Sequence, residues 1–111
     1  MPISRKIMGV SKGGVSKKAI FGYGIDNTDN TAVTNLVNNT GVVASDVSGV
    51  GTARSYLAAS SYGTDKAIFG YGITGFNVSM TNLVSNLGAV ASDVTGVGTA
   101  RQKLAASSYG S

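Results

Sequence analysis

The chain has 111 residues and contains no cysteine, no histidine and no glutamate, so it can form neither a disulfide nor a zinc site of the usual kind. The same absences exclude a histidine general base and a thiol nucleophile, and we expect neither enzyme activity nor a cofactor. The net charge is +4, but five of the nine basic residues and none of the five aspartates lie in the first 18 positions. The positive charge therefore belongs to one end of the chain.

Residues 1–17 form a basic N-terminal arm. Arms of this kind pair with acidic surfaces or phosphates, so we expect attachment to a larger body through four basic residues, Arg5, Lys6, Lys12 and Lys17. A solvated tail that only aids solubility is the alternative. Nucleic acid is expected as a partner only through this arm. The apolar run at 7–10 is too short for a secretory signal, and we expect no membrane span.

The rest of the chain is a tandem repeat. Residues 18–25 and 66–73 both read KAIFGYGI, and residues 34–63 match residues 81–110 at 24 of 30 positions. We therefore divide the chain into repeat 1 (18–65) and repeat 2 (66–111), within a single domain. Two repeats of this length are too few to close an array, because each repeat buries its apolar face only against a neighbour. The leading inference is self-assembly.

Each repeat is expected to form four strands. The chain is rich in Gly, Val, Ala, Ser and Thr, and helical periodicity is not sustained, which predicts an all-β fold with tight turns. In repeat 2 the four segments are 67–72, 78–86, 89–94 and 104–110. The last begins Leu104, Ala105, Ala106, and such small side chains suit a strand that is crowded by its neighbours. An edge strand with little to pack against is the alternative.

The order R-x-x-L-A-A-x-x-Y-G-x-D-K-A-I-F-G-Y-G at 54–72 resembles a kelch repeat. In that family an arginine precedes the innermost strand, and an aromatic strand with a glycine doublet follows. Here the doublet is split by Tyr71, and Val43 and Val90 replace the outer-strand tryptophan. The resemblance implies a β-propeller with two four-stranded blades per chain, closed by oligomerisation. An even number of blades then favours a homotrimer with six blades, over a dimer with four or a tetramer with eight.

The resemblance also implies how the ring would close. The segment 104–110 would be the innermost strand of a neighbour's first blade and would pair with residues 18–24 there, giving strand exchange between chains. The rival is that the arm, at 7–15, supplies this strand. The arginine of GVGTAR is expected to pair with an aspartate or a carbonyl and to tie blades together. The expected contacts between blades or subunits are made by Arg54, Arg101, Leu104, Ala105, Ala106, Phe21 and Phe69.

The opening SRKIMGVSKGGVSKKAIFGYG also resembles the start of short glycine-rich repeat proteins of tailed bacteriophages. This second resemblance implies a structural role on the virion, or a place in the cytoplasm of an infected bacterium, and otherwise leaves the localisation unknown. An engineered or consensus-derived propeller fragment would read in the same way.

A ligand site is the second hypothesis. Propellers assembled from two-blade chains occur among small sugar-binding lectins, which present aromatic residues, an acid and an arginine. This chain offers tyrosines for a carbohydrate groove between blades, namely Tyr23, Tyr71, Tyr62 and Tyr109, but it has no tryptophan. Asp46 and Asp93 occupy one position of the two repeats, in SDVSG and SDVTG, and we interpret them as turn residues because Gly follows each of them three residues later.

Overall fold

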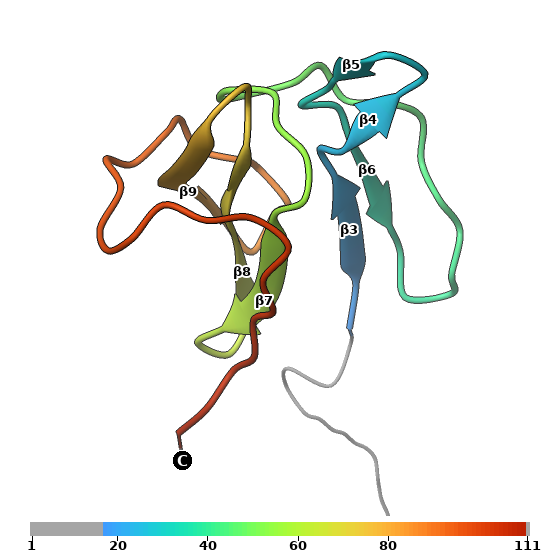
Figure 1. Ribbon diagram of the computed structural model, residues 1–111. Coiled ribbons are helices and arrows are strands. Elements are labelled where there is room, and N and C mark those ends of the chain that lie inside the picture. The colour runs from blue at the N-terminus through green and yellow to red at the C-terminus, as the bar shows by residue number, and fades with distance from the viewer. Residues whose placement is uncertain (1–16, 111) are drawn as a thin grey trace, which may run out of the picture.

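The computed structural model describes residues 17–110 and consists there of β-strands and turns, with no helix (Figure 1). The strands are β3 (Ala19–Gly22), β4 (Ile25–Asp26), β5 (Asp29–Asn30), β6 (Thr34–Val37), β7 (Ala58–Tyr62), β8 (Lys66–Ile73) and β9 (Asn77–Val84). All of their pairings are antiparallel. The expected all-β class is confirmed. The attachment residues Arg5, Lys6 and Lys12 and the rival strand at 7–15 lie outside the described residues.

The first sheet joins β3 to β6, with Ala19 opposite Val37 and Gly22 opposite Thr34. Two isolated bridges, Thr34 to Val47 and Val37 to Val43, add the segment 43–47 on the far side of β6. Within the described residues no segment pairs with the other side of β3. The first sheet thus has three extended segments and an open edge at β3.

The second sheet has the order β7-β8-β9. Isolated bridges from Thr81 to Val94 and from Val84 to Val90 add the segment 90–94 beyond β9, in the same way as in the first sheet. Strand β7 belongs to repeat 1 by sequence, yet it crosses over to become the first strand of the second sheet, as the order of segments predicted. The second sheet therefore has four extended segments. The long connection from the first sheet passes along the outer side of β6 and crosses the end of the molecule near β4 and β5 before it reaches β7 (Figure 1).

The segment 104–110 repeats the sequence of β7 but forms no strand. Its residues are exposed apart from Leu104, and Tyr109 is 100% exposed. The same sequence is thus ordered in a sheet in one place and unpaired in the other. This difference reflects the presence or absence of a neighbouring strand, because the two segments are identical from Leu57 to Gly63 and from Leu104 to Gly110.

The split glycine doublet forms a bulge. The register of β8 against β9 shifts between Gly70 and Gly72, and Tyr71 between them has φ 65°. Tyr23 occupies the same place in the first repeat and has φ 63°. Bulky residues rarely adopt this left-handed conformation, and bulges redirect side chains at functional positions. In both repeats the tyrosine in this conformation donates its hydroxyl to the GVGTAR segment, to Val50 from Tyr23 and to Val97 from Tyr71.

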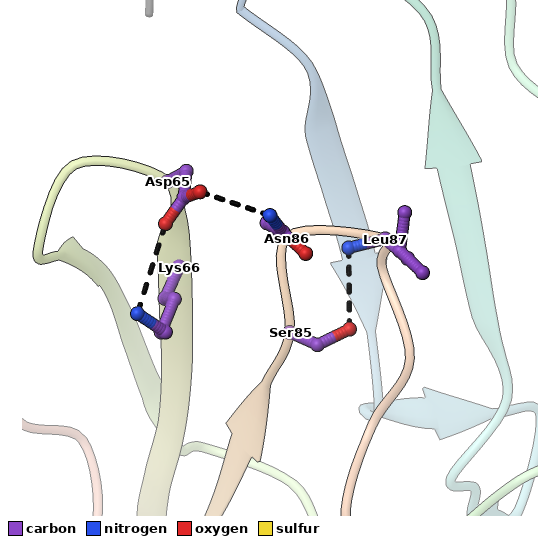
Figure 2. Close-up of polar contacts among 5 residues, drawn as sticks. All are labelled: Asp65, Lys66, Ser85, Asn86 and Leu87. Atoms are coloured by element: carbon purple, nitrogen blue, oxygen red, sulfur yellow. Dashed lines mark hydrogen bonds and ion pairs between the residues drawn. The ribbon is translucent and has the colours of Figure 1, made fainter.

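The turns of the second sheet are tied to one another (Figure 2). Asn86, in the turn after β9, donates from Nδ2 to Oδ2 of Asp65 at 3.0 Å, and Asp65 also lies 3.8 Å from Nζ of Lys66. Within the outer turn the amide of Leu87 donates to Oγ of Ser85 at 3.2 Å. These exposed contacts add little stability individually, but they connect the start of β8 to the turn that follows β9.

The one-residue difference between the repeats falls in the β4–β5 hairpin, which turns at Asn27. Nδ2 of Asn30 donates from this hairpin to the carbonyl oxygens of Ile73 and Thr74, at 3.3 and 3.2 Å. The β4–β5 hairpin of repeat 1 therefore contacts the second sheet through Asn30.

Candidate functional site

The junction between the two sheets is built around Arg54. Its side chain is fully buried, although it carries a charge that is costly to remove from water. Its Nε donates to the Tyr71 carbonyl at 2.8 Å, Nη1 to the Thr52 carbonyl at 3.0 Å, and Nη2 to Oδ1 of Asn82 at 2.7 Å. These bonds offset the desolvation of the guanidinium. Arg54 lies on the connection from the first sheet, while Tyr71 and Asn82 belong to the second, so it joins the two.

The ring of Tyr23 covers one face of this guanidinium. The Arg54 Cζ lies 4.7 Å from the ring centroid, within the range of a cation–π contact. The Tyr23 hydroxyl donates to the carbonyl of Val50 at 2.8 Å. Burial raises the pKa of the Tyr23 hydroxyl, an effect that the nearby positive charge of Arg54 partly opposes. Tyr23 therefore stays protonated and acts as a packing platform.

A second polar layer continues from Asn82, which is also fully buried. Its Nδ2 donates to the Ala91 carbonyl at 3.1 Å and to Oδ1 of Asp93 at 2.9 Å. The amide of Thr52 donates to Oδ1 of Asp93 at 3.1 Å, and the Thr52 hydroxyl to Oδ2 at 2.6 Å. Hydrogen bonds from Thr52 and Asn82 hold the pKa of the Asp93 carboxyl below its usual value, with a smaller contribution from Arg54. The carboxylate thus binds the connection from the first sheet to the second.

Apolar contacts complete the junction. Phe69 is only 4% exposed, and its ring centroid lies 5.0 Å from that of Tyr23 at an interplanar angle of 57°. Gly22 leaves room for this ring, because a Cβ there would lie 2.7 Å from the Phe69 Cζ. Leu36 of the first sheet packs over Gly88 of the second, where a Cβ would lie 2.8 Å from a Leu36 methyl. The buried contact between the rings of Tyr23 and Phe69 therefore lies between the sheets.

Every residue of this junction has an identical counterpart in the other repeat. Arg101 is the counterpart of Arg54. Its Cζ lies 4.6 Å from the Tyr71 ring centroid, and its Nη1 donates to the Thr99 carbonyl at 2.9 Å, as Arg54 does with Tyr23 and Thr52. In the described residues, however, Arg101 is exposed and has no bond matching those of Arg54 to Tyr71 and Asn82.

The matching acceptors lie on the first sheet. Nδ2 of Asn35 donates to the Ala44 carbonyl at 3.2 Å and to Oδ1 of Asp46 at 2.8 Å, which repeats the arrangement of Asn82, Ala91 and Asp93. Asp46 is exposed, and among residues 17–110 no guanidinium donates to the amide oxygen of Asn35. Asn35 and Asp46 are thus arranged like Asn82 and Asp93, but no arginine donates to Asn35 within the described residues.

The apolar contacts show the same division. Phe21, the counterpart of Phe69, is 63% exposed, and Leu83, the counterpart of Leu36, is also exposed. A Cβ on Gly41, the counterpart of Gly88, would meet nothing within 4 Å. The chain thus carries one closed junction and two separate halves of a second one.

Contacts inside each repeat, by contrast, occur twice. The Tyr23 hydroxyl bonds to Val50 and the Tyr71 hydroxyl to Val97, both at 2.8 Å. The amides of Gly24 and Gly72 donate to the carbonyls of Arg54 and Arg101, both at 2.9 Å. The two repeats therefore share the same internal structure, and they differ where one has a neighbour and the other has none.

The tyrosines proposed for a carbohydrate groove do not form one cluster. Tyr23 and Tyr71 stack on Arg54 and Arg101, Tyr62 lies at the end of β7 opposite Lys66, and Tyr109 is in the exposed tail. A groove of about 190 Å³ does lie between the sheets. The residues that line it are small or aliphatic, namely Thr34, Val47, Ser48, Val50, Gly88, Ala89 and Val90.

Among residues 17–110 no group of three acidic residues is placed to hold a metal ion. That part of the chain also has no helix long and apolar enough to cross a bilayer.

Sequence reasoning singled out Arg54, Arg101, Phe21 and Phe69 for contacts between repeats, and the structure places Arg54 and Phe69 in the junction. Arg54 donates to carbonyls and an amide rather than to an aspartate. The turn interpretation of Asp93 missed its bonds to Thr52 and Asn82, and Asn82 itself was missed. Its recurrence in TNLV at 34–37 and 81–84 was the available signal. Comparison with known proteins finds no family model that matches the chain and no curated protein that matches it.

Proposed function

We propose that this chain is a non-catalytic structural and binding module whose copies assemble head to tail into a closed β-propeller. The observation that carries the proposal is that the junction is formed only once within the chain, around Arg54. The equivalent residues, with Arg101 in one group and Asn35 and Asp46 in the other, are exposed and complementary. In the assembly Arg101 of one copy lies against Asn35 and Asp46 of a second copy, as Arg54 lies against Asn82 and Asp93.

Both polar and apolar groups support this contact. The donor half presents Arg101 already stacked on Tyr71, so little side-chain freedom is lost on binding. The acceptor half presents Asn35 already oriented by Asp46, and it exposes the ring of Phe21. An aromatic ring beside an arginine is the usual composition of an energetic hot spot. The two halves are complementary in charge as well, since one carries a guanidinium and the other a carboxylate.

Such a contact joins different faces of the two copies, so it forms a ring if the rotation closes and a filament if it does not. With two blades in each chain a closed ring contains an even number of blades, and we propose three chains and six blades. Attachment of this ring to a virion or another larger body would use the basic arm, which each copy contributes once.

An oligomeric lectin remains the second candidate function. The groove between the sheets is the feature that favours it, and the ring would present several equivalent grooves. The residues lining the groove include no aromatic and no charged side chain, whereas sugar sites usually combine both. A glycan array decides between the two. Binding confined to one sugar and lost when the groove residue Ala89 is changed to Trp would put the lectin first.

The proposal is tested by comparing two substitutions at one repeat position. Phe21→Ala should dissociate the assembly while the chain remains folded by circular dichroism, because the Phe21 ring is exposed in the single chain. Phe69→Ala should destabilise the chain itself, because its ring is buried. An assembly that survives Phe21→Ala and Arg101→Ala together would contradict the proposal.

A further inference from the structure

We infer that the segment Leu104–Gly110 forms the innermost strand of the first sheet of a second copy, where it pairs antiparallel with β3 in one defined register. The inference rests on the proposed head-to-tail assembly and goes beyond it, because two sheets can pack side by side without exchanging a strand. Its basis is the pairing of β7 with β8 inside the chain.

The internal pairing supplies the register. Ala58 lies opposite Gly70, Ser61 opposite Ala67 and Tyr62 opposite Lys66. Residues 104–110 have the sequence of 57–63, and residues 18–25 have that of 66–73. The equivalent pairs between copies are Ala105 with Gly22, Ala106 with Phe21, Ser107 with Ile20, Ser108 with Ala19 and Tyr109 with Lys18.

The lead-in to the segment already has the conformation of the lead-in to β7. Tyr56 and Lys103 occupy the same position and have φ 53° and 57°. The Ser60 hydroxyl donates to the Ser61 carbonyl at 3.0 Å, and the Ser107 hydroxyl to the Ser108 carbonyl at 3.1 Å. The segment thus shares local geometry with β7 before it has any strand to pair with.

The arginine contact fixes where the strand begins. Four positions separate Arg54 from the first residue of β7, and the same four separate Arg101 from Ala105. When Arg101 donates to Asn35 of a second copy, this spacing places Ala105 beside the free edge of β3 in that copy. There the unpaired amides and carbonyls of both strands satisfy one another, which is strand addition to an open sheet edge. In that position Ala105, Ala106 and Ser107 take the place at the edge of the first sheet that Ala58, Ala59 and Ser60 of β7 take in the second sheet, where Ala58 and Ser60 are half-buried.

Cysteine crosslinking tests the register directly, because the chain contains no cysteine of its own. One chain carries Ala19→Cys and another carries Ser108→Cys, and the two are mixed, dissociated, reassembled and oxidised. Directly opposite residues of an antiparallel pair have the spacing that a disulfide needs. We expect the 19–108 crosslink, identified by mass spectrometry, to be the main product of oxidation between chains.

Two controls frame the result. Ser61→Cys with Ala67→Cys in one chain should crosslink internally, because these residues are opposite one another. Ala19→Cys mixed with Ser107→Cys should crosslink at least tenfold less, because a shift by one residue turns the side chain to the other face of the strand. Equal yields for 107 and 108 in an assembled protein would overturn the strand register and leave the proposed assembly standing.

Hydrogen exchange of the unmodified chain is a second test of the strand pairing, and it needs no substitution. Amides of β3 and of 104–110 should become protected together as the concentration rises through the assembly transition. An assembly in which β3 is protected while 104–110 stays unprotected would overturn the inference, and would place another segment, such as the arm, on the edge of β3. A chain that stays monomeric would remove the proposed assembly and the strand exchange together.

Discussion

Arg54 and Arg101 occupy the same position of two nearly identical repeats, and each stacks on a tyrosine, at 4.7 Å from Tyr23 and at 4.6 Å from Tyr71. Arg54 is nevertheless fully buried, whereas Arg101 is exposed. The segment GVGTAR that ends at each arginine is the same, and only Arg54 has a neighbouring sheet to contact. A substitution at a buried residue such as Arg54 should therefore affect the fold, and the same substitution at its exposed counterpart, Arg101, should affect assembly. Each repeat thus serves as a control for the other.

Substitution of Arg101 and of Asn35 in separate chains should show that Arg101 of one copy contacts Asn35 of another. Arg101→Ala removes the donor and keeps the acceptor, while Asn35→Ala removes the acceptor and keeps the donor. Losing a charged hydrogen bond costs about 1.5–3 kcal/mol, so each variant alone should dissociate about 10- to 100-fold more readily. An equimolar mixture retains one intact pair and should form a 1:1 complex, measured by analytical ultracentrifugation. An interface that does not place Arg101 of one copy against Asn35 of another would give no such complementation.

The phenylalanine pair should separate folding from assembly in energetic terms. Phe69→Ala removes a buried ring from the junction and should lower the free energy of unfolding by about 3–5 kcal/mol. Phe21→Ala should leave the unfolding of the dissociated chain nearly unchanged, because its ring is already exposed there. Urea unfolding at concentrations below the assembly transition measures both. Equal destabilisation by the two substitutions would contradict the assignment of the two faces.

Two glycines offer a steric version of the same comparison. Gly51 and Gly98 have φ 83° and 87°, so alanine is strained at both positions by about 1–3 kcal/mol. A Cβ at Gly51 would also lie 2.5 Å from Nδ2 of Asn82, whereas at Gly98 the nearest atom is the Tyr71 hydroxyl at 3.3 Å. Gly51→Ala should therefore lower the thermal stability of the chain more than Gly98→Ala does. Gly98→Ala should instead block assembly, because Asn35 of the second copy would occupy that space, and native mass spectrometry checks this.

Acid should weaken the junction through Asp93. The pKa of its carboxyl is lowered in the folded chain, so the folded state binds fewer protons than the unfolded state as the pH falls below the ordinary value of 3.8. The stabilisation is present above that value and is lost as the pH falls through the lowered pKa. The midpoint of thermal unfolding should hold steady down to about pH 4 and then decline.

Asp93→Asn should make that decline shallower, while Asp26→Asn, at an exposed residue of β4, should leave it unchanged. Scanning calorimetry across the acid range compares the three chains. A decline that is identical in all three would show that Asp93 does not contribute to it.

The sequence predicted the all-β class and the crossing of β7 into the second sheet. Both predictions were possible because the repeat and the spacing of its glycines can be read directly from the sequence. It also indicated that Arg54 joins the repeats. It could not indicate that Asn82 is the acceptor or that Asp93 binds Thr52, because these contacts depend on how the sheets pack. The bulge at Tyr71 was visible only as a split doublet, and its left-handed φ is a feature of the folded backbone. Propeller closure stays a prediction.

The mass of the unmodified protein in solution tests the central claim most directly. Light scattering coupled to size-exclusion chromatography should give three times the 11.1 kDa of the chain, and Arg101→Ala should shift the mass toward that of a single chain. Two or four copies would keep the head-to-tail contact and change the number of blades. A folded protein of one chain mass at every concentration up to the millimolar range would contradict the account.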